Sequence, residues 1–166
     1  MSKKPPKKTL SAAHYEAVGR VVVACSALQH ILSICAFSLA VNDSSPWKDD
    51  VGVAVLTTGM SAQTLIGACR TLARIRAPED ADEFDKLADN MRKTFAQRDL
   101  FAHCIWKPGK KRGTVIPELA KTIGSMRKTQ DRAYTAAEIT KTQEIAGEHM
   151  MNLLGFLVRW GIAPMP

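Results

Sequence analysis

The feature that most restricts this chain is an uncharged segment of 21 residues, Val21–Val41, which reads VVVACSALQHILSICAFSLAV. Together with the lysine-rich N-terminus before it, the segment has the length and the flank of a membrane signal-anchor helix. Gln29 and His30 stand at its centre, however, and three serines recur along it, which is costly in a bilayer but ordinary in a helix surrounded by other helices. We therefore expect a buried helix of a soluble protein. A small membrane-anchored protein is the alternative.

Composition agrees with a single helical domain. The chain has 166 residues, of which 46% are hydrophobic and 23% charged, the balance of a globular protein with a core of its own. Only 6% are aromatic, whereas Ala, Leu, Ile and Met recur in long runs, which favours helices over short strands. The sequence predicts an all-α bundle over residues 11–161, a flexible basic arm over 1–10 and a C-terminal tail over 162–166.

The cysteines indicate a reducing compartment. They lie far apart and form no CxxC pair, so neither zinc-ligand spacing nor a redox motif is present; they are Cys25, Cys35, Cys69 and Cys104. Free cysteine behaves as a small hydrophobic residue and is commonly buried. We therefore expect free thiols and a cytoplasmic protein.

Local signals predict four main helices. The first covers 12–41 and ends at the polar, proline-containing cluster 42–46; the second covers 51–76 and ends before Pro78. The third begins among the acidic residues of 79–83, where negative charge meets the positive end of the helix dipole. Its apolar stripe steps by three or four residues and continues to two further positions; it consists of Phe84, Leu87, Met91 and Phe95, followed by Arg98 and Ala102.

The segment before the last helix contains glycines and prolines between Lys107 and Pro117, which predicts a loop or a small hairpin. Residues 118–133 give no clear signal. Thr135 and Glu138 are spaced as a capping box, so the fourth helix should start there and continue to Gly161.

The segment with the strongest chemical content is 97–106, QRDLFAHCIW, at the end of the third helix. Arg98 and His103 lie about 140° apart on an ideal helix and so border one surface. Asp99 and His103 are four residues apart, so the carboxylate can accept a ring N–H and orient the imidazole as in acid–base sites. The alternative is structural: Arg98 bonds helix-end carbonyls, and His103 favours the negative end of the helix dipole.

This segment resembles the signature of HEPN domains, which are all-α bundles. Arg98-Asp99-x-x-Ala102-His103-x-x-Trp106 is similar to the RNxxAHxxW motif of compact bacterial members, and it lies at the end of the third helix, as it does in that family. Three positions differ from the residues common there: Asp99 replaces Asn, Cys104 replaces Gly, and Gln29 in the first helix replaces Glu.

The resemblance implies metal-independent RNA cleavage at a homodimer interface, where two copies of the motif face each other. His103 would transfer a proton and Arg98 would stabilise the developing phosphorane charge, while Asp99 would orient the pair. No cofactor and no metal are implied. The family context is one of toxins and phage defence, with an antitoxin or a nucleotidyl-transferase as a possible partner protein. A non-catalytic dimeric HEPN-like binding or regulatory module is the alternative.

The charge of the chain is compatible with an RNA partner. Lys and Arg exceed Asp and Glu by 23 to 16, which gives a net charge of +7. Four basic residues follow the motif directly and are the candidate RNA-backbone contacts; they are Lys107, Lys110, Lys111 and Arg112. Ordinary solvated charge is the alternative reading of these residues.

Overall fold

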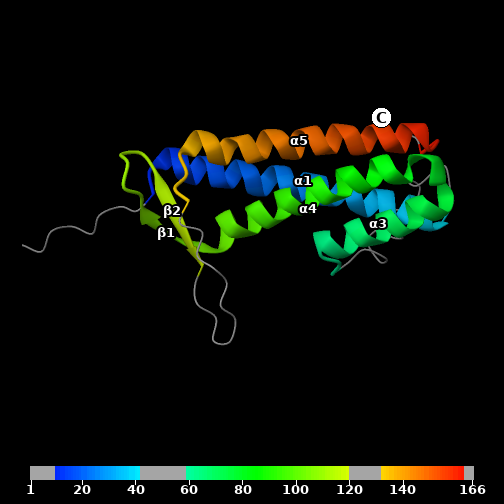
Figure 1. Ribbon diagram of the computed structural model, residues 1–166, viewed down its shortest axis with the longest axis horizontal. Coiled ribbons are helices and arrows are strands. Elements are labelled where there is room, and N and C mark those ends of the chain that lie inside the picture. The colour runs from blue at the N-terminus through cyan, green and yellow to red at the C-terminus, as the bar shows by residue number, and fades with distance from the viewer. Residues whose placement is uncertain (1–9, 42–58, 120–131, 163–166) are drawn as a thin grey trace, which may run out of the picture.

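The computed structural model describes residues 10–41, 59–119 and 132–162, and it is mostly helical (Figure 1). Four α-helices and one two-stranded sheet make up these parts of the chain, so the predicted all-α bundle with a small hairpin before the last helix is confirmed. In chain order the elements are α1 (Ala12–Val41), α3 (Ala62–Arg76), the short 3₁₀ helix η2 (Pro78–Asp80), α4 (Ala81–His103), β1 (Cys104–Pro108), β2 (Val115–Leu119) and α5 (Ala136–Arg159).

Helix α1 is the central element of the bundle and has the predicted bounds. It packs against α3, α4 and α5, and Figure 1 shows it parallel to α5 along most of its length. One stripe of α1 points into the core at steps of three or four residues; it consists of Ala17, Val21, Cys25, Leu28, Leu32, Cys35 and Leu39. Such a stripe is typical of a helix that packs one face against its neighbours. Leu10 and Ile162, just outside the predicted domain, also belong to the core.

Among the described helices, α1 is also the one that is long and apolar enough to cross a membrane: the candidate span is Ala12–Ala40, and its most apolar 18-residue window has a mean hydropathy of 1.8. The core helix of a soluble protein passes the same test. In the most apolar part of α1, 44% of the residues are buried inside the bundle. The arrangement is thus compatible with a soluble protein.

Helix α3 begins later than predicted. Ser61 caps it by accepting a hydrogen bond from the backbone N–H of Thr64 at 3.2 Å, and Gly59, with φ of 79°, lies in the turn before it. A serine hydroxyl at this position satisfies an amide that the helix itself cannot. The predicted helical stretch 51–58 lies outside the described residues.

Helix α4 follows the predicted stripe as far as its last two turns. Phe84, Leu87, Met91 and Phe95 are buried. The prediction for Ala102 is wrong, because Ala102 is exposed and Phe101 is buried in its place. The Phe101 ring packs against two aromatic rings beyond the end of α4, those of Trp106 and Tyr134. Burial of this ring also removes more apolar surface from water than burial of the Ala102 methyl group would.

The hairpin connects the end of α4 to the start of α5. Its strands are antiparallel, with Cys104 opposite Leu119 and Pro108 opposite Val115. Val115 and Tyr134 exchange backbone hydrogen bonds of 2.8 and 2.7 Å, which ties the hairpin to the residue before the N-cap of α5. That N-cap is Thr135, and the predicted capping box with Glu138 is present. The hairpin thereby holds the C-terminal end of α4 close to the N-terminal end of α5.

A buried histidine on α5 makes stability depend on pH. His149 contacts the hydroxyl of Thr94 on α4 through Nε2 at 3.1 Å, and burial lowers the pKa of its ring, with a smaller opposing effect from Glu148. The unfolded chain therefore takes up a proton near pH 6.5 that the folded chain resists. We expect the free energy of unfolding to fall as the pH drops from 7 to 5, and to fall less in His149→Gln. Urea unfolding at both pH values checks this, and an equal fall in the two proteins would contradict it.

Candidate functional site

The last two turns of α4 direct the motif residues to different sides. Arg98 is turned inward, with its side chain 25% exposed and its guanidinium carbon 5.9 Å from the centre of the Phe95 ring. It lies close enough to α1 to act on the buried thiol of Cys25: burial raises the pKa of Cys25 to about 11, and the positive charge of Arg98 partly opposes that rise. His103 is exposed. At the C-terminal end of α4, the Arg98 side chain therefore lies against the bundle, whereas the His103 side chain lies on the surface.

Asp99 pairs with Arg98 and not with His103. Its carboxylate lies 3.0 Å from a guanidinium nitrogen of Arg98, and its side chain is 56% exposed. The predicted contact with His103 is absent, since no hydrogen bond or ion pair within the described residues joins the two side chains. The guanidinium is always charged, whereas an imidazole is charged only below its pKa, so Arg98 is the stronger partner. Asp99 thus orients the arginine of the motif.

His103 occupies the end of α4. It is the last helical residue, and the backbone turns to an extended conformation at Cys104, with φ of −87° and ψ of 159°. In the described ranges no hydrogen bond or ion pair joins another side chain to the His103 ring, and the residue is exposed.

An aromatic cluster fixes the motif against the hairpin and α5. The ring of Phe101 stacks on Trp106 of β1 at 5.9 Å and meets Tyr134 edge-on at 5.1 Å, between ring centres. The guanidinium carbon of Arg132 lies over the Tyr134 ring, 4.9 Å from its centre. Trp106 is partly buried and packs against the core. Because Phe101 lies between Arg98 and His103 in sequence, this packing sets the position of both.

The four basic residues after the motif divide into two groups. Lys107 on β1 forms an ion pair with Glu118 on β2, which neutralises it. Lys110, Lys111 and Arg112 are exposed in the turn of the hairpin, where no ion pair within the described residues reaches them. The turn is well formed, because Gly113 has φ of 78° and Thr114 bonds twice to the carbonyl of Lys111. Three unpaired cations are thus held on one rigid turn.

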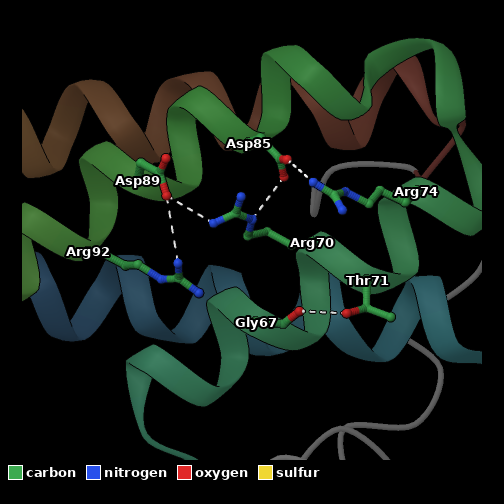
Figure 2. A network of polar contacts seen from close by, with 7 residues as sticks. All are labelled: Gly67, Arg70, Thr71, Arg74, Asp85, Asp89 and Arg92. Carbon is green, nitrogen blue, oxygen red and sulfur yellow. Dashed lines mark hydrogen bonds and ion pairs between the residues drawn. The ribbon is translucent and has the colours of Figure 1, made fainter.

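Sequence patterns did not reveal a network of ion pairs between α3 and α4, which Figure 2 shows. Arg70 donates to Asp85 through Nε and to Asp89 through Nη1, both at 2.9 Å. Arg74 also donates to Asp85, and Arg92 lies 3.7 Å from Asp89. The hydrogen bonds from Arg70 and Arg74 hold the pKa of Asp85 below its usual range. The four-residue spacing within each helix was visible in the sequence, but the pairing across helices was not.

Comparisons with protein-family models, with curated proteins and with solved structures find no match for this chain. The described residues contain no group of three or more His, Cys, Asp or Glu side chains that could hold a metal ion.

Proposed function

We propose that this protein is a metal-independent endoribonuclease of the HEPN type, a cytoplasmic homodimer whose site combines the motifs of two chains. One observation carries the proposal: the charged Arg98 and the open His103 lie within about one and a half turns at the accessible end of one helix. Arg98 is already oriented by Asp99. These are a charge stabiliser and a proton-transfer group at the spacing that the resembled motif has.

The reaction would be an attack of the RNA 2′-oxygen on the neighbouring phosphorus. The bond to the 5′-oxygen breaks, the proton of the 2′-hydroxyl is removed, and the 5′-oxygen receives a proton as it leaves. His103 of one copy serves as base and His103 of the other as acid, which requires two open imidazoles. Arg98 stabilises the negative charge of the phosphorane. The products are a cyclic phosphate and a 5′-hydroxyl.

Exposed apolar side chains support association with a second copy. Ile105, two residues after His103, is 56% exposed on β1. Tyr15 and Val23 on α1, and Met151 and Val158 on α5, are also more than half exposed. Burial of such side chains in a dimer removes apolar surface from water. Contact around Ile105 would bring the two His103 side chains toward each other.

The turn of the hairpin supports an RNA substrate. Lys110, Lys111 and Arg112 follow directly on the strand that begins next to His103. Cations that have no ion-pair partner on the protein can bind backbone phosphates, and they do so whatever the base sequence. The same residues would serve a protein that binds RNA without cleaving it.

A non-catalytic dimeric binding module is the second candidate. The observation that favours it is the ion pair between Arg98 and Asp99, because this carboxylate neutralises the charge that a phosphorane would need. In the catalytic reading, Asp99 releases or shares the guanidinium when RNA binds. Cleavage itself separates the two candidates.

The test is cleavage of a labelled single-stranded RNA by the purified chain in EDTA, with the dimer mass measured by light scattering. We expect a dimer at micromolar concentration and products with cyclic phosphate ends. RNA binding by a dimer without cleavage would favour the binding module. A monomer, or cleavage that stops with the chelator, would contradict the composite metal-independent site.

A further inference from the structure

Three arginines are among the five residues that line a hollow on the outside of the α3–α4 pair. Its volume is about 280 Å³, and the residues around it are Gly67, Arg70, Thr71, Arg74 and Arg92. Asp85 and Asp89, which pair with these arginines, do not line it. In Figure 2 the guanidinium groups of Arg70, Arg74 and Arg92 point toward the carboxylates of Asp85 and Asp89 on α4, and the same three arginines line the hollow.

The arginines keep binding capacity beyond their ion pairs. Each guanidinium has five N–H donors, and the contacts with Asp85 and Asp89 engage only part of them in each arginine. Three cations face two carboxylates, so a positive charge is left over. The ion pairs also hold Arg70 nearly fixed, with its side chain 23% exposed. A bound anion would meet donors that are already ordered.

Gly67 keeps the hollow open. A Cβ built at this position in α3 would meet nothing within 4 Å, so the space above the backbone is free. Glycine inside a helix is destabilising relative to alanine, and here neither a turn nor a close packing contact requires it. The hydroxyl of Thr71, which also lines the hollow, donates to the carbonyl of Gly67 at 3.2 Å.

We propose that this hollow binds a phosphate group, with the guanidinium groups of Arg70, Arg74 and Arg92 as its donors. Arginine forks match phosphate oxygens in geometry and charge. Arg92 and His103 lie eleven residues apart on α4, which is three turns and about 16 Å along one face of the helix. An RNA strand cleaved at His103 could place a backbone phosphate in the hollow. RNA as the source of this phosphate rests on the proposed function, whereas phosphate binding by the hollow does not.

The test uses the full chain with two probes. The first is inorganic phosphate, followed by NMR of the arginine Nε–H signals. The second is a fluorescent 2′-O-methyl RNA, which has no free 2′-hydroxyl to attack its own phosphates and so reports binding without cleavage. Arg92→Gln removes one donor group and Gly67→Leu fills the hollow without changing charge. Lys86→Gln, an exposed cation on α4 outside the hollow, and Gly147→Leu, an equally open glycine on α5, are the matched controls.

We expect Arg92→Gln to weaken binding about tenfold, the scale of one charge-assisted hydrogen bond, and Gly67→Leu to weaken it at least as much. The controls should stay within about twofold, the scale of one screened surface charge. Weaker binding of both probes identifies an RNA phosphate, and weaker binding of inorganic phosphate alone identifies a free phosphate or nucleotide. If neither probe binds, or if both bind the hollow variants as they bind the controls, the proposal is overturned. Neither readout uses cleavage, so an inactive His103 would not affect this result.

Discussion

Replacement of His103 by alanine should lower the rate of RNA cleavage by about 100-fold or more, the scale of a lost acid–base group. Arg98→Ala should cause a loss of the same order, because the phosphorane charge then has no guanidinium beside it. The rate is measured on a labelled single-stranded RNA in EDTA at saturating protein. Both losses should appear in the rate of the chemical step rather than in RNA affinity, since the hairpin cations remain.

The controls for this result follow from the positions of the side chains. His103 is exposed, so its replacement should leave helical content and dimer mass unchanged. Arg98 packs over Phe95, and Arg98→Gln keeps much of its volume without the charge, which separates chemistry from packing. His30, an exposed histidine on α1, is the matched histidine control, and His30→Ala should cleave at the normal rate. Full activity in both site variants would leave the non-catalytic binding module as the better proposal.

The elements that sequence reasoning predicted are those that local chemistry specifies. The first helix has its predicted bounds because its apolar repeat starts and stops with clear flanking signals. The capping box at Thr135 involves two residues three positions apart, and the hairpin follows from glycines and prolines close together. None of these features needs knowledge of where a distant segment lies.

The differences arise where the outcome depends on contacts between elements. Phe101 is buried in preference to Ala102 because Trp106 and Tyr134 come to meet its ring, and helical periodicity alone carries no information about them. Helix α3 starts at Ala62 because the hydroxyl of Ser61 caps it, although the apolar pattern extends further back in the sequence. The ion pairs of Arg70 join residues that are 15 and 19 positions apart.

The candidate site shows the same division. The sequence placed Arg98, Asp99 and His103 at one end of a helix, and they lie there. Spacing predicted His103 as the partner of Asp99, whereas Asp99 pairs with the neighbouring Arg98, whose long and permanently charged side chain reaches it. In the proposed dimer each chain contributes half of the active centre. The distance between the two His103 side chains then depends on the dimer interface, which no local sequence motif describes.

Phe101→Ala should lower the free energy of unfolding by about 3–5 kcal/mol, because a fully buried ring is lost and a cavity is left among Trp106, Tyr134 and the end of α4. Urea unfolding measures this loss. Phe156→Ala is the matched control: its ring is also buried, but it packs on Phe84 and Trp160 near the opposite end of α4.

The two variants should lose similar stability and differ in activity. In Phe101→Ala the end of α4 is no longer fixed against the hairpin, so cleavage per folded molecule should fall at least tenfold, since reacting groups displaced by about 1 Å lose rate steeply. In Phe156→Ala it should stay near normal at temperatures where the protein is folded. Equal activity in the two folded variants would mean that the aromatic cluster only stabilises the bundle, and that another contact, such as the dimer interface, positions Arg98 and His103.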